Sequence, residues 1–206
     1  MEKYIYTNKN SLSSEVCRDI IELFENEDRK YDGVTQGGMQ KNIKDTKDFV
    51  IPENEAKWYK YHKFLSDELT RNSHIYINKL NDNPSFQNVN QKTNNIFKHF
   101  SGVNISHSGF MAQRYIRNEG RYVYHNDFSV DLKNKKNRVI TYLWYLNDVE
   151  EGGETDFPDA NLMIKPETGK LVLFPASWDF PHCGKIPISS NKYIVTGWLY
   201  QDITNK

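Results

Sequence analysis

The sequence predicts an α+β fold that is mainly β, in which two amino-terminal helices cover an all-β carboxyl-terminal half. Apolar residues recur at helical spacing in residues 13–29 and again in residues 55–80. From Gly109 onward the pattern changes to short apolar or alternating runs separated by turns, which is typical of a β-sandwich or barrel. With 206 residues the chain fits one domain that is large enough to bury a core.

Each predicted helix carries one apolar face. In the first helix, Ser13 is a suitable N-cap, and the apolar positions are Val16, Cys17, Ile20, Ile21 and Phe24. In the second helix the corresponding positions are Trp58, Tyr61, Leu65 and Leu69. Residues 31–51 lie between the helices and contain three glycines, so we expect a hairpin or a mobile loop there.

The strands of the β half are expected at residues 110–116, 122–127, 138–146, 169–174 and 193–200. Residues 133–137 form a polar, basic loop between two of these runs. No internal repeat interrupts the order, so the whole chain, 1–206, is expected to be one domain. Within it, residues 1–108 are the helical support and residues 109–200 are the β core.

Composition excludes several classes of protein. The 27 basic and 27 acidic residues give a formal net charge of +0, which argues against a large nucleic-acid interface. Cys17 and Cys183 form no metal or redox spacing motif. Residues 1–10 lack the apolar stretch of a signal peptide, and no run is long enough for a membrane span. A cytoplasmic protein without a membrane partner is therefore expected.

A candidate metal site begins with His125 and Asp127. Residues two apart on a strand point to the same face, so an imidazole and a carboxylate can reach one ion. His182 is the best third ligand, because it sits in a Pro-His-Cys-Gly turn after a predicted strand. Two histidines and one carboxylate are the ligand set of non-haem iron(II) oxygenases. The remaining histidines have no partner at ligand spacing: His62, His74, His99 and His107.

The last predicted strand supplies a candidate cation for an anionic cosubstrate. Lys192 opens this strand, and period-two geometry places it on one face with Ile194, Thr196 and Trp198. An inward-facing lysine is costly unless it meets an anion. No arginine follows Arg138, so Lys192 is the strongest candidate in the late strands.

Two tyrosines offer hydroxyl groups for the same pocket. Tyr145 shares a strand face with Thr141 and Leu143, and Tyr115 shares one with Gln113. Either hydroxyl can donate a hydrogen bond to a carboxylate inside a barrel. Each is equally well explained as a core tyrosine whose hydroxyl is satisfied elsewhere.

Several of these residues fall in motifs that resemble one family. The order Gln113-Arg-Tyr115, His125-Asn-Asp127, Tyr145-Leu-Asn-Asp, His182-Cys-Gly and Lys192-Tyr-Ile-Val-Thr-Gly-Trp198 is similar to the prolyl 4-hydroxylase group of 2-oxoglutarate-dependent dioxygenases. The resemblance spans roughly residues 109–200, about the carboxyl-terminal half of the chain.

The resemblance implies a double-stranded β-helix, or jelly roll, flanked by the amino-terminal helices. It implies that His125, Asp127 and His182 are the catalytic iron ligands and that Lys192 binds the distal carboxylate of 2-oxoglutarate. Tyr145 and Tyr115 match positions in the cosubstrate pocket, and Thr196 and Trp198 match inner-face positions close by.

The cofactors implied by the resemblance are Fe(II), 2-oxoglutarate and O2, with ascorbate as reductant. The expected partner is a peptide or protein that contains proline, and the products are the hydroxylated substrate, succinate and CO2. Because substrate should approach the metal last, residues 31–51 are a candidate lid. Residues 177–181 are unusually aromatic and border the predicted site, so the acceptor need not be collagen.

Two alternatives remain open from the sequence. The acceptor can be a small molecule or a free amino acid. The protein can also be a non-catalytic jelly-roll module that holds structural Zn²⁺ at the same three residues, although such a module has no need of Lys192, Tyr145 and Tyr115. Nucleic-acid demethylation is disfavoured by the neutral charge and by a lysine in place of an arginine.

Overall fold

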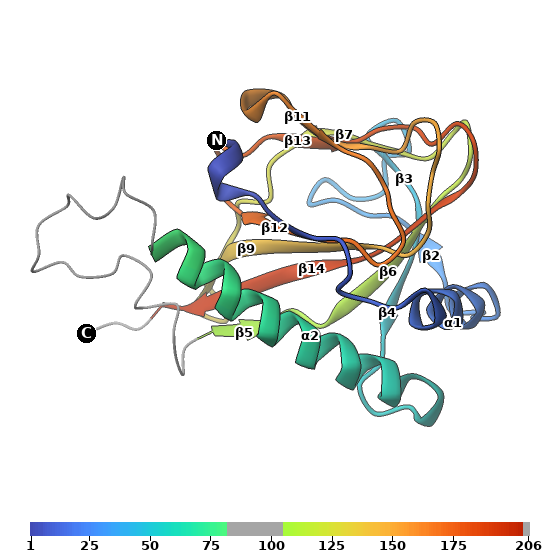
Figure 1. The fold of residues 1–206 in the computed structure, drawn as a ribbon, viewed down its shortest axis with the longest axis horizontal. Coiled ribbons are helices and arrows are strands. Elements are labelled where there is room, and N and C mark those ends of the chain that lie inside the picture. Colours follow the sequence, from blue (N-terminus) through green and yellow to red (C-terminus); the bar gives the residue numbers. More distant parts are fainter. Residues whose placement is uncertain (82–104, 204–206) are drawn as a thin grey trace, which may run out of the picture.

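Two stacked β-sheets with helices on one outer face make up the protein (Figure 1). The computed structural model describes residues 1–81 and 105–203. The larger sheet has the strand order β1-β12-β9-β14-β6-β4-β2, with β5 beside β14 and β8 beside β9. The smaller sheet has the order β11-β10-β13-β7-β3. The jelly roll predicted from the sequence is confirmed.

The strands are mostly short, and the long ones lie at the centre of the larger sheet. The described strands are β1 (Tyr6–Asn8), β2 (Tyr31–Asp32), β3 (Lys44–Asp45), β4 (Lys47–Ile51), β5 (Ile105–His107), β6 (Phe110–Tyr115), β7 (Arg121–His125), β8 (Val130–Asp131), β9 (Lys136–Tyr145), β10 (Thr155–Phe157), β11 (Leu162–Ile164), β12 (Leu171–Pro175), β13 (His182–Gly184) and β14 (Lys192–Asp202). Two short 3₁₀ helices, η1 (Glu2–Tyr4) and η3 (Pro158–Ala160), complete the described elements.

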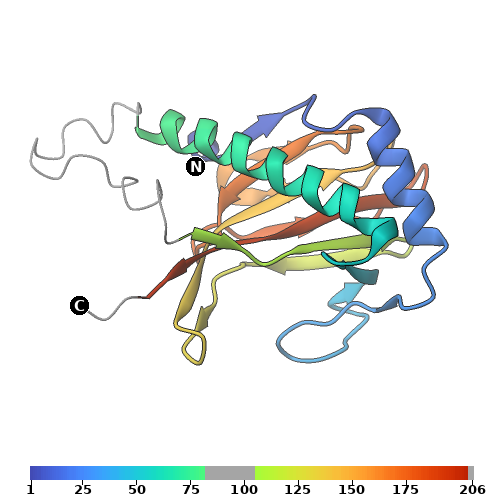
Figure 2. The same ribbon diagram turned by 90° about the horizontal axis from the view of Figure 1, so that it is seen from below.

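Both predicted helices are present on the outer face of the larger sheet (Figure 2). Helix α1 (Ser14–Glu25) begins where expected, because the Ser13 hydroxyl accepts a hydrogen bond of 3.3 Å from the amide of Val16. Helix α2 is longer (Ala56–Asn81). Their apolar faces pack on the outward side chains of β6, β9 and β14, and this packing forms one of two hydrophobic cores. None of the described helices is long and apolar enough to cross a membrane.

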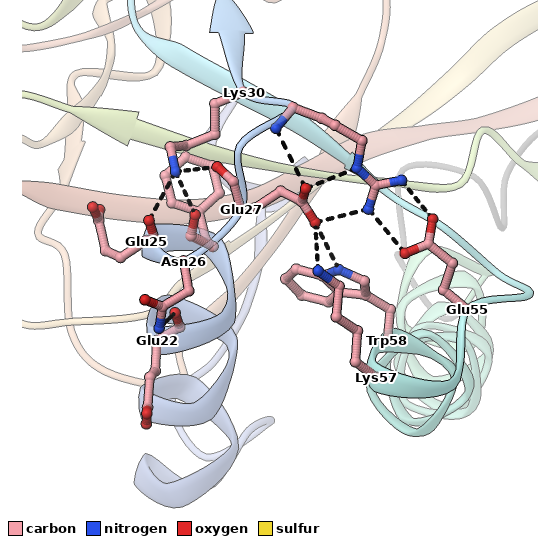
Figure 3. A network of polar contacts seen from close by, with 10 residues as sticks. Glu22, Glu25, Asn26, Glu27, Lys30, Glu55, Lys57 and Trp58 are labelled. Atoms are coloured by element: carbon pink, nitrogen blue, oxygen red, sulfur yellow. Dashed lines mark hydrogen bonds and ion pairs between the residues drawn. The ribbon is translucent and has the colours of Figure 1, made fainter.

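A buried carboxylate joins the end of α1 to the start of α2 (Figure 3). Glu27 is 3% exposed and accepts hydrogen bonds from the Arg29 guanidinium at 2.7 and 2.8 Å. The ammonium of Lys57 lies 2.9 Å from the same carboxylate, and the indole of Trp58 donates at 3.4 Å. Arg29 also binds Glu55, so this network fixes the two helices relative to each other.

The second hydrophobic core fills part of the space between the two sheets. It is built from inward-facing residues of both sheets, including Leu143, Tyr145, Phe157, Phe174 and Ile194. The remaining space between the sheets is a cavity, described below. The helices therefore support the larger sheet from outside, while the inner faces are left to form a site.

Three local expectations need correction. His182 does not lie in a turn but opens strand β13, which pairs with β7. Strand β7 ends at His125, so Asp127 lies in the following loop and not on the strand. Residues 31–32 and 44–51 are not part of a free hairpin, because β2, β3 and β4 are built into the two sheets and only the loop between Asp32 and Lys44 projects from them.

Candidate metal centre

His125, Asp127 and His182 converge at one end of the space between the sheets. The register of β7 and β13 places His182 directly opposite His125, and their ring centroids are 4.3 Å apart. The Asp127 carboxylate lies 3.8 Å from His125 Nε2 and 3.5 Å from His182 Nε2. One ligand atom from each residue lies within 4.8 Å of the others. A single ion can therefore contact all three side chains.

Backbone carbonyls fix which nitrogen each histidine offers. His125 Nδ1 lies 2.8 Å from the carbonyl oxygen of Val123, and His182 Nδ1 lies 3.1 Å from that of Phe180. A carbonyl can only accept, so both Nδ1 atoms carry a proton, and in the neutral imidazole Nε2 is then the nitrogen with the free lone pair. Such outer hydrogen bonds orient metal-binding imidazoles in known sites.

Asp127 is buried and remains ionised. The Thr141 hydroxyl donates a hydrogen bond of 2.7 Å to its Oδ2 atom. Burial alone would raise the pKa of this carboxyl, but His182, His125 and the Thr141 hydroxyl outweigh burial and lower it. The pKa of His125 is also lowered, because the ring is desolvated and faces His182. The lowered pKa values of Asp127 and His125 favour an ionised carboxylate and a neutral imidazole, which are the protonation states that a divalent cation requires of its ligands.

The three residues open into a cavity of about 710 Å³ between the sheets. Lys192, Ile194, Thr196 and Trp198 all line it, as their period-two spacing on β14 predicts. The opposite walls come from β7, β13 and the loop that contains residues 34–37. The three candidate metal ligands and Lys192 therefore line the same cavity.

Lys192 is a buried ammonium that lacks an acidic partner among the described residues. It is 2% exposed, its Nζ donates to the Gly153 carbonyl at 3.0 Å, and it lies 4.0 Å from the centroid of the Tyr115 ring. Burial lowers the pKa of Lys192 from 10.5 to about 7. A Cβ at Gly184 would lie 3.4 Å from Nζ, so glycine leaves space beside the ammonium. The site suits a bound carboxylate.

The two predicted tyrosines differ in position. Tyr115 lines the cavity, and its hydroxyl donates to Gln113 Oε1 at 3.3 Å. Tyr145 is fully buried beside the cavity rather than in its lining. Its hydroxyl lies 2.6 Å from the Thr155 hydroxyl and 3.1 Å from the Ile164 carbonyl, so its hydrogen bonds are already made. A direct contact of Tyr145 with a cosubstrate stays a prediction.

Thr196 and Trp198 line the cavity nearer to the metal candidates. The Thr196 hydroxyl donates a hydrogen bond of 2.8 Å to the backbone carbonyl of Tyr142, so its proton is already used within the larger sheet. The Trp198 ring faces the Arg138 guanidinium at 3.6 Å from its centroid, and its buried indole N–H is one of the groups that lower the pKa of Asp127. Thr196 therefore shapes the wall, while Trp198 helps to keep Asp127 ionised.

The other histidines do not join this site. His62 and His107 lie near each other between α2 and β5, with ring centroids 5.9 Å apart. His74 is exposed on α2, and His99 lies outside the described residues. Residues 34–37 of the proposed lid line the cavity, which agrees with a gating role, although closure itself stays a prediction.

Sequence reasoning missed the polar residues that surround the ligands. Lys44 and Asp48, both buried in the cavity wall, come from a segment that was expected to be a loop. Their spacing carries no motif, so no sequence signal marks them. Thr141 was assigned to the correct strand face, but its hydrogen bond to Asp127 depends on the loop after β7 and cannot be read from either segment alone.

The donor set fits a divalent transition-metal ion such as iron, together with a bound carboxylate. Two imidazoles and one carboxylate occupy one side of the ion, and the cavity leaves room on the other side. The ammonium of Lys192, which has no acidic partner in the described part of the chain, marks where an anionic group would bind.

Comparison with known proteins agrees with this geometry. Residues 110–200 match the family model for the 2OG-Fe(II) oxygenase superfamily. Probable prolyl 4-hydroxylase 3 of Arabidopsis thaliana is 37% identical over 109 residues, which cover 39% of this chain and 38% of that protein. Prolyl 4-hydroxylase subunit alpha-2 of Gallus gallus is 34% identical over 98 residues, covering 45% of this chain and 18% of that protein. The chain thus spans less than half the length of these curated relatives.

Solved structures share the fold across nearly the whole chain. The viral collagen prolyl hydroxylase of Paramecium Bursaria Chlorella virus-1, solved with 2OG, has a TM-score of 0.66 at 19% identity and covers 96% of each chain. A prolyl hydroxylase of Trichoplax adhaerens, solved with a hypoxia inducible factor peptide, has a TM-score of 0.70 at 21% identity, covering 97% of this chain and 84% of the other. Over residues 110–200 the chain is therefore similar to the 2OG-Fe(II) oxygenase superfamily, and the similar proteins are prolyl 4-hydroxylases.

Proposed function

We propose that the protein is an Fe(II)- and 2-oxoglutarate-dependent dioxygenase that hydroxylates prolyl residues of a peptide or protein, releasing succinate and CO2. The observation that carries the proposal is the buried, unpaired ammonium of Lys192 in the same cavity as the three candidate ligands. A structural metal site needs the ligands but not the lysine. A keto acid with a distal carboxylate needs both.

The candidate ligands, Lys192 and the apolar wall of the cavity have different proposed roles. His125, Asp127 and His182 would hold iron through Nε2, a carboxylate oxygen and Nε2. Bound iron supplies the oxygen chemistry that couples decarboxylation of 2-oxoglutarate to hydroxylation. Lys192 would bind the distal carboxylate of 2-oxoglutarate and thereby orient its keto acid end. Apolar side chains of the cavity wall would exclude water around it: Leu143, Phe174 and Ile194.

The charges of the cavity favour a peptide over a free amino acid as the acceptor. Among the described lining residues the carboxylates are Asp127 and Asp48. Asp127 faces the two histidines, and Asp48 is already paired with Lys44 at 2.7 Å. The positively charged amino group of a free amino acid would therefore find no acidic partner, and its desolvation would be uncompensated. In a peptide the same nitrogen is a neutral amide.

The described mouth of the cavity also suits an uncharged chain. Among the lining residues Val34 and Phe128 are about half exposed, at 52% and 49%, and the Arg138 guanidinium lies over the Trp198 ring. Apolar side chains beside one guanidinium can contact a peptide through its apolar groups and its backbone carbonyls. The similar proteins are prolyl hydroxylases, which supports proline as the acceptor.

A direct assay tests the proposal. The protein is incubated with Fe(II), 2-oxoglutarate, O2 and ascorbate, with proline-containing peptides, with the same peptides carrying alanine, or with free proline. We expect succinate together with a peptide that has gained one oxygen atom, and no product from the alanine peptides. His182→Ala should abolish both products, whereas Lys185→Ala, on the same segment but ion-paired with Asp156, should not. Hydroxylation of free proline alone would favour the amino acid hydroxylase. Metal binding without succinate would favour the binding module.

A further inference from the structure

A line of buried polar contacts crosses one wall of the cavity, starting in the amino-terminal segment. Lys44 and Asp48 are 4% and 0% exposed, and Lys44 Nζ lies 2.7 Å from Asp48 Oδ2. The Thr46 hydroxyl donates to Asp48 Oδ1 at 2.7 Å. The Gln113 amide donates to Asp48 Oδ2 at 3.2 Å, across the paired strands β4 and β6. The charge of Asp48 is thus neutralised and its oxygens are occupied.

Asp48 determines which way the Gln113 amide points. An ionised carboxylate only accepts hydrogen bonds, so Gln113 must turn its NH2 group toward Asp48. Gln113 Oε1 then faces Tyr115, whose hydroxyl donates to it at 3.3 Å. Burial raises the pKa of Tyr115 well above 10.0, so the phenol keeps the proton that this bond requires. The ring of Tyr115 is therefore held at its hydroxyl end.

The Tyr115 ring in turn supports the ammonium of Lys192. These residues are direct neighbours on β6 and β14, and Lys192 Nζ lies 4.0 Å from the ring centroid. A cation at this distance is attracted to the face of an aromatic ring. A ring fixed by Gln113 gives the ammonium one position, whereas a ring free to tilt would not.

We propose that Asp48 and Gln113 are positioning residues for the cosubstrate site: they fix Tyr115, and through it Lys192, and so raise the affinity for 2-oxoglutarate. The inference rests on the proposed function. It assigns residues 44–48, which the sequence placed in a candidate lid, to the fixed wall of the cosubstrate pocket. Because the lysine side chain is already ordered, the binding of 2-oxoglutarate does not carry the entropic cost of ordering it.

A double-mutant cycle tests this relay. Binding of 2-oxoglutarate to the Fe(II)-loaded protein is measured by calorimetry without O2 for the wild type, Gln113→Met, Tyr115→Phe and the double variant. Each single variant loses the same hydrogen bond, so each should weaken binding about three- to tenfold. The double variant should be no weaker than either single variant, because the bond can be lost only once. Affinity for Fe(II) should stay at the wild-type value in all of them.

Lys47→Met is the matched control, because Lys47 lies on the same strand but pairs with Asp32 at the partly exposed sheet edge. Its 2-oxoglutarate affinity should equal that of the wild type. Multiplicative losses in the double variant, or unchanged affinity in both single variants, would overturn the relay. If the wild type itself binds no 2-oxoglutarate, the proposed function fails instead. Circular dichroism and thermal unfolding confirm that each variant is folded before its affinity is compared.

Discussion

Replacing Lys192 by methionine should stabilise the ligand-free protein and destroy its response to 2-oxoglutarate. The lysine is buried, makes one hydrogen bond to Gly153 and lacks an acidic partner in the described structure. Methionine has a similar length and fills the same space without a charge. A stabilising substitution inside a proposed active site is the signature expected of a residue kept for binding an anion.

The size of the effect follows from the pKa of Lys192. Each unit of pKa corresponds to about 1.4 kcal/mol, so the fall from 10.5 to about 7 represents about 5 kcal/mol against the charged form. Methionine also loses the hydrogen bond from the ammonium to the Gly153 carbonyl, which offsets about 1.5–3 kcal/mol of the stability gained by removing the charge. Below pH 7 we therefore expect Lys192→Met to raise the free energy of unfolding by about 2 kcal/mol.

The sign of the pH dependence is also fixed. Between pH 7 and 10.5 the unfolded chain binds a proton at Lys192 that the folded protein releases, so the wild type gains stability as pH rises. The methionine variant has no such proton. Its advantage should be complete below pH 7, shrink by about 1.4 kcal/mol per pH unit above it and be reversed by pH 10.5, as measured by urea denaturation of both proteins at each pH.

Lys44→Met is the matched control, because Lys44 is a second buried lysine in the same cavity wall but is paired with Asp48. Removing its charge leaves a buried carboxylate without its cation and should cost about 3 kcal/mol. With metal present, 2-oxoglutarate should raise the melting temperature of the wild type but not of Lys192→Met. Equal destabilisation by the two substitutions, or retained stabilisation by 2-oxoglutarate in Lys192→Met, would refute the reasoning.

Three further predictions concern the ligands and the helix contacts. His182→Ala should lower Fe(II) affinity at least tenfold by calorimetry and abolish succinate formation, and full activity would refute its role. Arg29 holds the pKa of Glu27 well below 4.5, so the free energy of unfolding should fall as the pH drops below 4.5. Glu27→Gln should lower the free energy of unfolding by about 2 kcal/mol at neutral pH. In urea denaturation this variant should also lose less stability below pH 4.5 than the wild type does. Burial lowers the pKa of His62 below 6.5, so the free energy of unfolding should also fall as the pH drops below 6.5. In urea denaturation, His62→Phe should lose less stability over this pH range than the wild type does.

The sequence identified the candidate ligands by residue type and spacing, but their geometry comes from pairing between distant strands. His125 and His182 face each other because β7 and β13 pair in a register that includes an irregularity after His182. Neither strand contains a local signal for that partner or that register. Asp127 reaches the site from a loop, where the same-face rule for strands does not apply. The ligand set was therefore predicted for a partly incorrect reason.

The same rule succeeded for Lys192 and only in part for Tyr145. Strand β14 is long and central, so alternation holds from Lys192 to Trp198 and all four inner residues reach the cavity. Tyr145 also points to the inner side, but β10 and β11 lie against it and occupy its hydroxyl through Thr155 and Ile164. These are three-residue strands, too short for their pattern to be recognised. Alternation gives the face of a side chain, but not what else lies on that face.

The contrast between Lys44 and Lys192 separates an enzyme from a metal-binding module on physical grounds. Both are buried lysines in one cavity, yet among the described residues a carboxylate pairs with Lys44 and none pairs with Lys192. A protein that merely holds a metal gains nothing from an ammonium that opposes folding by several kcal/mol. A protein that binds a dicarboxylate recovers this cost when the ligand supplies the missing charge. The unpaired lysine is thus more informative than the three metal ligands, because a structural metal site would explain the ligands equally well.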